Sequence, residues 1–247
     1  MGQIAYTLNE RKMLEAFSLT DKEWGELSAL PRGSILMPHS NWPAIPKVSI
    51  HGLRFFAHYQ GYPYSLPTPK SYAHTRLQID IVRAARNLGL KANLEVSGSD
   101  SDGNEWVADV LIESKSTQKF AFEVQLSSQH YKDFIKRTER YERSNMKSCW
   151  FISNKPVADR LCKAIAYQNK DFYKKHGQFL GDDPRLVTFD VDILNKNSYP
   201  DLLPPVRFGR GKFHKRLTLS ESIYGMVNGF PYWECPDWKW LDDKNII

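Results

Sequence analysis

Residues 107–125 decide the fold, and they read VADVLIESKSTQKFAFEVQ. Apolar residues alternate with other residues on both sides of the polar segment 113–118, which predicts two strands joined by a turn. Successive side chains of a strand point to opposite faces, so Val110 and Ile112 share one face and Asp109 lies on the other. The stretch therefore predicts a hairpin with one apolar face.

The returning strand fixes how the two halves of this hairpin pair. It leaves Glu123 on the face opposite the apolar residues Phe120, Phe122 and Val124. A turn centred near Ser116 then places Asp109 directly across from Glu123. A slip of one residue would separate the two apolar faces, so the pattern specifies this register.

Two carboxylates that face each other across a strand pair repel, and a divalent cation is one way to compensate them. Mg²⁺ takes oxygen ligands and is typically held by one or two carboxylates together with a substrate phosphate. Such an ion polarises a phosphodiester and lowers the pKa of an attacking water. The alternative is that Lys119 or Arg137 neutralises one of the two acids.

Two neighbouring side chains extend this acidic group. Gln125 lies two residues beyond Glu123 on the same face, within reach of the attacking water or the scissile phosphate. Glu95, on the preceding strand, adds a third carboxylate or orients a water. We expect both to belong to the same site as Asp109.

The elements around the hairpin follow from apolar periodicity and turn residues. A helix over 72–88, ended by Gly89, precedes it, and another helix over 129–143 follows. The predicted strands are 92–96, 106–112, 119–125, 148–153 and, after a helix from Pro156 to about residue 167 and a polar stretch, 185–191. Before residue 69, frequent prolines allow a short helix, short strands and a hairpin around His51-Gly52.

At this point the residues resemble the PD-(D/E)XK nuclease superfamily and, more closely, the CoiA-like competence proteins. The resemblance covers residues 71–153, and residues 55–58 (Phe-Phe-Ala-His) are similar to a His-Phe-Ala-His segment of that family. The matching features are His74, Leu94-Glu95, Ala108-Asp109-Val110, Phe122-Glu123-Val124-Gln125, Ser127, Arg137 with Tyr141, and Trp150-Phe151-Ile152.

The resemblance implies an α/β fold with a restriction-endonuclease-like core, in the order αβββαβ, whose central mixed sheet is flanked by helices. It implies a deoxyribonuclease that hydrolyses DNA with Mg²⁺ or Mn²⁺ held by Asp109 and Glu123. Family members are tied to processing of incoming DNA during natural transformation, and related nucleases act in antiphage defence.

The chain departs from the family pattern at several positions. Gln125 stands where the superfamily usually has Lys, although CoiA-like proteins commonly have Gln there. Val107 and Gln78 replace an Arg and a Lys of the family. The N-terminal cysteines of relatives are absent, so zinc binding is not carried over. We expect residues 1–69 to form a small domain in the zinc-ribbon position without its ligands, 70–155 the nuclease core and 156–247 a C-terminal helical and mixed region.

Further residues are candidates for contact with DNA. His74 would touch phosphate or water near the metal, or act as a structural hydrogen-bonding group. Arg137 would bind a phosphate, or lay its stem over the core. Segment 207–216 (RFGRGKFHKR) has two Phe, no acid and five cations, Arg207, Arg210, Lys212, Lys215 and Arg216, which suits phosphate contact and base stacking. An ordinary surface loop is the alternative for this segment.

Composition sets the remaining limits. The net charge is +6 and the pI about 9.1, which mildly favours a polyanionic partner such as DNA. Three widely spaced cysteines support neither a zinc ribbon nor a disulfide framework, and no apolar stretch is long enough to span a membrane. We therefore expect a cytoplasmic protein without a membrane partner. The tryptophans of the C-terminus belong to the core or to an interface with a second copy or another protein: Trp233, Trp238 and Trp240.

Three functions remain open on the sequence. The first is a metal-dependent DNA endonuclease in DNA processing or antiphage defence. The second is a DNA-binding module whose hydrolysis is weakened by Gln125. The third is an interaction subunit of a multi-protein defence or recombination complex, docked through its aromatic C-terminus.

Overall fold

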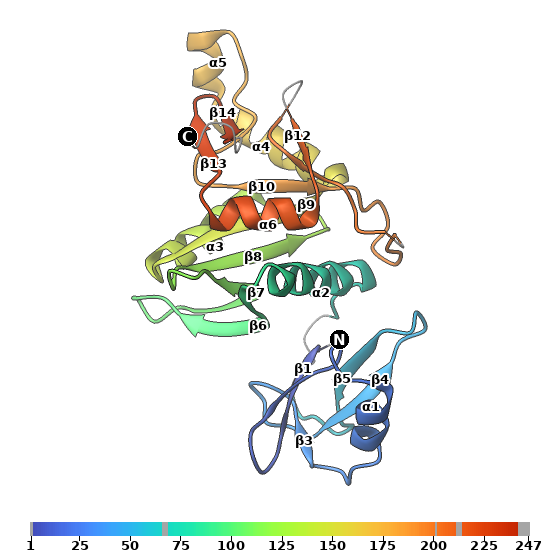
Figure 1. Cartoon of the computed structure of the whole chain (residues 1–247). Helices are drawn as coiled ribbons and strands as arrows, with labels where there is room; N and C mark the ends of the chain where they lie inside the picture. Colours follow the sequence, from blue (N-terminus) through green and yellow to red (C-terminus); the bar gives the residue numbers. More distant parts are fainter. Residues whose placement is uncertain (1, 66–68, 201, 211–213, 242–247) are drawn as a thin grey trace. The chain divides into compact units, whose positions relative to one another are not determined.

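Two units, residues 1–71 and 72–247, each have their own strands, helices and buried core in the computed structural model (Figure 1). The structure describes residues 2–65, 69–200, 202–210 and 214–241.

The first unit is built from short strands around one helix. β1 (Ile4–Thr7) pairs antiparallel with β2 (Met13–Glu15) and β3 (Ile35–Leu36). β4 (Ala44–Val48) and β5 (Arg54–His58) form the hairpin predicted around His51-Gly52, where Gly52 adopts a φ of 75°. The helix α1 (Asp21–Ser28) begins with a capping box between Thr20 and Glu23. Its Trp24 packs on Phe56 inside the core of this unit.

The second unit begins with the predicted order of helix, three strands, helix and strand. These elements are α2 (Tyr72–Asn87), β6 (Lys91–Ser99), β7 (Glu105–Glu113), β8 (Lys119–Gln125), α3 (Tyr131–Arg143) and β9 (Met146–Ser153). Gly89, which follows α2, has a φ of 74°, and this accounts for its predicted role in ending the helix.

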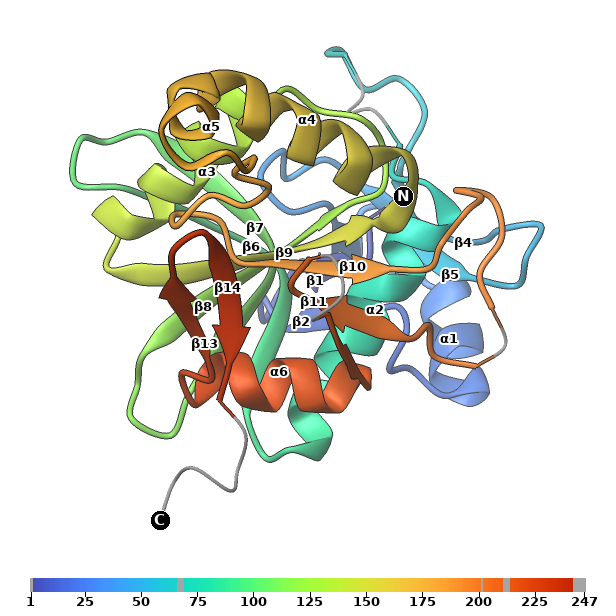
Figure 2. The same ribbon diagram turned by 90° about the horizontal axis from the view of Figure 1, so that it is seen from above.

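All strands of this first part belong to one seven-stranded sheet in the order β12-β11-β10-β9-β8-β7-β6. β8, β9 and β10 (Thr188–Val191) run parallel, and the pairs on either side of them are antiparallel. Figure 2 shows α3 and α4 (Asp159–Gln168) on one face of the sheet and α2 and α6 (Leu219–Val227) on the other. The fold is therefore mixed α/β with a central mixed sheet flanked by helices.

Residues 156–247, predicted as a C-terminal helical and mixed region, extend this sheet. β10, β11 (Val206–Phe208) and β12 (Lys215–Leu217) are three of its seven strands. The π-helical turn η1 (Asn154–Ala158) leads into α4. The polar stretch after residue 167 contains a helix that the periodicity did not predict, α5 (Lys170–His176). A last hairpin consists of β13 (Pro231–Glu234) and β14 (Asp237–Trp240).

A row of aromatic rings crosses the sheet from β8 to β11. Neighbouring ring centroids lie 4.9 to 6.1 Å apart along Phe122, Phe151, Phe189, Phe208 and Trp240. Trp240 thus packs into the core of the sheet, and Trp233 packs against a second cluster that contains Trp150. The terminal tryptophans hold the C-terminal hairpin on the unit, which is the core role allowed by the sequence. Within the described residues, no helix has the length and apolar character needed to cross a bilayer.

Candidate active site

The predicted hairpin forms in the predicted register. Val110 pairs with Phe122 and Ile112 with Phe120, so the next opposed positions are Asp109 and Glu123. On the other side of β7, Leu94 pairs with Val110 and Val96 with Ala108. Glu95 therefore lies directly across from Asp109. The three acidic residues Glu95, Asp109 and Glu123 are opposed to one another on three neighbouring strands, a position along the sheet that is here called the acidic level.

The regular alternation of side chains is broken at this level. Ala108 and Leu111, three residues apart on β7, both pack in the cluster around Tyr141, whereas strict alternation would send them to opposite faces. On the neighbouring strand, Glu95 has a φ of 53°, which is rare for a residue other than glycine inside a strand. The local backbone therefore re-aims Asp109, and the prediction that Asp109 and Glu123 share one face is wrong in this detail.

Asp109 points towards α2 and is held by three groups. Its Oδ1 accepts a hydrogen bond of 2.7 Å from Gln78, and its Oδ2 accepts one of 3.0 Å from the backbone N–H of Val124. His74 Nε2 lies 3.4 Å from Oδ2. His74 and Gln78 are four residues apart, so one face of α2 presents both side chains to the carboxylate. Asp109 is 7% exposed.

Glu123 is fully buried and is held from α3. Its two oxygens accept hydrogen bonds from the guanidinium of Arg137 and from the hydroxyl of Tyr141. The Arg137 guanidinium also lies over the Trp150 ring, 5.0 Å from its centroid. Glu123 is thus neutralised by Arg137, which is the alternative that the sequence left open.

Electrostatics keep this cluster in its charged form. Burial lowers the pKa of Arg137, but the interactions with Glu123, Tyr141 and Asp109 outweigh burial and raise it overall. Burial, followed by the charge of Glu123 and the hydrogen bond to it, raises the pKa of Tyr141 far above its usual value. Tyr141 is therefore a neutral donor at neutral pH, and Arg137 remains a cation whose charge also acts on Asp109.

The other predicted members of the acidic site lie close along the strands. Gln125 pairs with Ile152 of β9, and its amide donates to the Ser127 carbonyl oxygen at 2.6 Å. Glu95 is half-buried. Among the residues that the structure describes, no three His, Cys, Asp or Glu side chains gather around one point. Asp109 is held from α2 and Glu123 from α3, so the two carboxylates point to helices on opposite faces of the sheet.

The predicted basic segment divides between exposed and buried side chains. Arg207 of β11 lies opposite Arg216 of β12, and Arg207 also contacts Asp192 at 3.3 Å. Arg216 is exposed and Lys215 is half-buried. Lys212 lies outside the described residues.

Arg210 differs from its neighbours. It bonds Asp182 at 3.0 Å, Asp190 at 2.6 Å and the Thr188 hydroxyl at 3.0 Å, and its side chain is only 16% exposed. This placement favours a structural role for Arg210 over the predicted contact with DNA.

Two residues of the site were not predicted from the sequence. Gln78 and Tyr141 each bond one of the two carboxylates. The resemblance named Tyr141 beside Arg137 and Gln78 at the position of a family Lys, and helical spacing placed them on the faces of Arg137 and His74, but neither residue was given a role. That spacing shows which side chains share a helix face but not which strand residue they meet.

Comparison with known proteins gives one family. Residues 70–189 match the family model described as competence protein CoiA, nuclease-like domain. No curated protein matches the chain.

Proposed function

Through residues 70–189 this chain belongs to the CoiA nuclease-like family, and from that membership we propose a specific activity. The protein is a metal-dependent endonuclease that hydrolyses DNA phosphodiester bonds, in DNA processing or antiphage defence. Its core is of the PD-(D/E)XK type, in a variant with Gln125 at the position of the usual lysine.

One observation carries the proposal. The register of β6, β7 and β8 brings Glu95, Asp109 and Glu123 to one level of the sheet. At the same level the strands depart from regular geometry, since Glu95 has a positive φ and the alternation on β7 shifts. Backbone strain of this kind clusters at functional sites.

The donor set fits Mg²⁺ or Mn²⁺ in its chemistry. Asp109 and Glu123 would hold the ion, because hard cations prefer carboxylate oxygens and Mg²⁺ keeps several waters besides one or two protein ligands. When bound, the ion would supply Lewis-acid polarisation of the phosphodiester and an acidified water. Each Asp109 oxygen accepts a hydrogen bond, one from Gln78 and the other from the backbone of Val124. For one ion to be held by both, Arg137 would have to release Glu123, and the carboxylates of Asp109 and Glu123 would have to turn towards each other.

The neighbouring side chains orient the reacting groups. His74, beside Asp109, is placed to hold a water or a phosphate oxygen, and Glu95 to orient the attacking water. The Gln125 amide donates a hydrogen bond but carries no charge, so it stabilises the developing negative charge on phosphate less than a lysine would.

The basic residues of β11 and β12 contact DNA away from the site of cleavage. β12 is four strands from β8, which is about 19 Å at a strand spacing of about 4.8 Å. Arg207, Lys215 and Arg216 would bind phosphates at that distance and fix the position of the duplex without reading its sequence.

A second function is favoured by one observation. The Glu123 carboxylate is occupied by Arg137 and Tyr141, and Gln125 replaces a cation. A DNA-binding module with weak hydrolysis would have these properties. The two functions differ in whether any divalent ion permits cleavage.

The test is incubation of the purified chain with single-stranded DNA, duplex DNA and RNA, each with Mg²⁺, with Mn²⁺ and with EDTA. The proposal predicts cleavage of DNA with a divalent ion and none in EDTA. Retained DNA binding without cleavage under every metal condition would establish the binding module instead. Cleavage that persists in EDTA would contradict metal dependence.

A further inference from the structure

The second part of unit 1 has an unusual composition. Residues 27–71 contain no Asp or Glu, although the whole chain has 28 in 247 residues. The same stretch contains four cations (Arg32, Lys47, Arg54 and Lys70) and six aromatic residues (Trp42, Phe55, Phe56, Tyr59, Tyr62 and Tyr64). A surface formed by such a stretch attracts polyanions and repels no phosphate.

Four of these six residues lie together with His58 and are here named the aromatic cluster: Trp42, His58, Tyr59, Tyr62 and Tyr64. The Tyr62 ring centroid lies 4.3 Å from that of His58, 5.7 Å from that of Trp42 and 5.6 Å from that of Tyr64. Tyr64 is 74% exposed, and the other four residues are half-buried. The cluster therefore presents ring surface to solvent.

The polar atoms of the cluster hold the rings in position. Trp42 Nε1 donates to the Tyr59 carbonyl oxygen at 2.9 Å, and His58 Nε2 lies 3.1 Å from the Ser40 hydroxyl. Burial lowers the pKa of His58, which makes it a neutral ring at pH 7. Rings fixed in advance lose little side-chain freedom when a flat ligand stacks on them.

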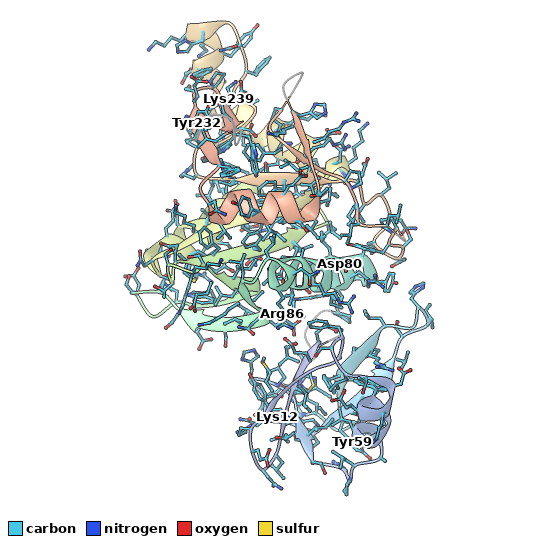
Figure 3. The ribbon with its side chains drawn as sticks, viewed as in Figure 1. Lys12, Tyr59, Asp80, Arg86, Tyr232 and Lys239 are labelled. Carbon is cyan, nitrogen blue, oxygen red and sulfur yellow. The ribbon has the colours of Figure 1, made fainter. Side chains whose placement is uncertain are left out.

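Two exposed arginines border the aromatic cluster. The Arg32 guanidinium lies 3.9 Å from the centroid of the Tyr59 ring, whose side chain is labelled in Figure 3. Arg11 Nη1 donates to the side chain of Asn41, the residue before Trp42, at 2.7 Å. The cluster thus combines ring faces with positive charge, as binding sites for single strands do.

The aromatic cluster is separate from the core that holds unit 1 together. That core consists of Ala5, Leu14, Ala16, Trp24, Ile35, Met37, Ala44 and Phe56, and it includes no member of the cluster. The rings are therefore not needed to fill the core.

We propose that the aromatic cluster, together with Arg11 and Arg32, is a binding surface for single-stranded nucleic acid. Bases of a single strand are free to stack on the rings, and phosphates meet the arginines. A duplex keeps its bases stacked inside, so it meets only the charges. The proposal extends the proposed nuclease function by adding a strand-binding surface in unit 1, and it stands independently of whether the Asp109 site cleaves.

The test measures binding of the full chain in EDTA, so that cleavage does not interfere. Labelled oligothymidine, an abasic strand of equal length, the corresponding RNA and a duplex are titrated by fluorescence anisotropy. Tyr64→Ala is the main variant, with Tyr62→Leu and Arg32→Gln beside it. Tyr167→Ala, 72% exposed on α4, and Lys22→Gln, with an 86% exposed side chain on α1, are the matched controls.

We expect Tyr64→Ala to weaken oligothymidine binding by about 5- to 150-fold, the range for loss of one base–ring stack. The same variant should leave abasic-strand and duplex binding unchanged, and Arg32→Gln should weaken all four ligands. Both controls should bind as the wild type does. If the variant loses the same affinity for RNA as for DNA, the surface binds single strands of both nucleic acids. If it loses affinity for only one of them, the surface is assigned to that nucleic acid.

The proposal is overturned if Tyr64→Ala and Tyr62→Leu both bind oligothymidine as tightly as the wild type. It is also overturned if their losses are the same for the abasic strand, since the rings would then not be stacking on bases. A normal cleavage rate with unchanged binding would contradict this surface alone and leave the Asp109 site intact.

Discussion

The carboxylate of Glu123 has two uses in this molecule, and they conflict. The fold uses it as the buried partner of Arg137 and Tyr141. The proposed chemistry uses the same oxygens to hold a divalent ion. An arginine in the place of a metal keeps the charge compensated while no ion is bound, because an unpaired charge at this depth would be costly.

Arg137→Gln should therefore destabilise the protein in EDTA. The change leaves a fully buried carboxylate without its cation, at a cost of about 3 kcal/mol, the low end for a buried pair because the Arg137 side chain is one-third exposed. Urea unfolding measures the loss, and Lys136→Gln, an exposed neighbour on α3, is the control. The double variant Glu123→Gln/Arg137→Gln should recover part of the stability. An Arg137→Gln variant as stable as the control would contradict this account of Glu123.

At the residue scale, the sequence predicted which residues lie opposite each other on the strands better than it predicted their side-chain contacts. Apolar alternation was sufficient to predict that Asp109 and Glu123 are opposed, because the register depends on local pattern. It did not predict that Gln78 and Tyr141 would hold the two carboxylates, since these contacts join residues 31 and 18 positions apart. Arg210 was predicted as a surface cation and lies instead between two aspartates of other segments.

At the scale of the element, β6, β7 and β8 are consecutive antiparallel strands whose geometry is irregular at one position, the acidic level. Glu95 adopts the left-handed backbone region in the middle of β6. A side chain at a positive φ costs about 1 kcal/mol relative to glycine. In β6 this unfavourable conformation occurs at Glu95, directly across from Asp109, whose side chain is turned towards α2.

Comparing Glu95→Gly with Glu95→Ala separates the backbone from the carboxylate. Both variants lose the side chain, but only glycine accepts a φ of 53° freely. We expect Glu95→Gly to be more stable than Glu95→Ala by about 1 kcal/mol in urea unfolding. Both should lose DNA cleavage to the same extent if the carboxylate orients the water. Equal stability of the two variants would show that the backbone at this position carries no strain.

The limits of helices and strands with clear apolar periodicity were predicted to within a few residues. Elements without such periodicity were not predicted. α2, β8 and α3 show clear periodicity and begin and end close to their predicted limits. α5 buries none of its residues, so the apolar spacing by which helices are recognised is missing. The shift of alternation at Asp109 depends on the backbone of the neighbouring strand and left no mark in the residues of β7 themselves.

At the scale of the whole molecule, two units with separate cores carry two different sets of chemistry. Unit 1 presents rings and arginines, and unit 2 presents the carboxylates of one sheet level. Residues 156–247 complete the sheet of unit 2, and periodicity could not predict this because strand partners far apart in sequence set the order β10, β11 and β12. The nuclease-like family match over residues 70–189 lies across the part of unit 2 that holds the acidic level.

The most direct test of the central claim is the Mg²⁺-dependent cleavage rate of Asp109→Asn compared with Asp171→Asn. Asparagine keeps an oxygen for one of the two donors, Gln78 or Val124, but loses the charge that would hold the ion, whereas Asp171 has an 83% exposed side chain on α5. Because changes next to metal ligands cost about 10- to 100-fold, loss of the ligand itself should lower cleavage by at least about 100-fold. Asp171→Asn should cleave like the wild type, with both variants folded by circular dichroism. Wild-type cleavage by Asp109→Asn would contradict the assignment of this site.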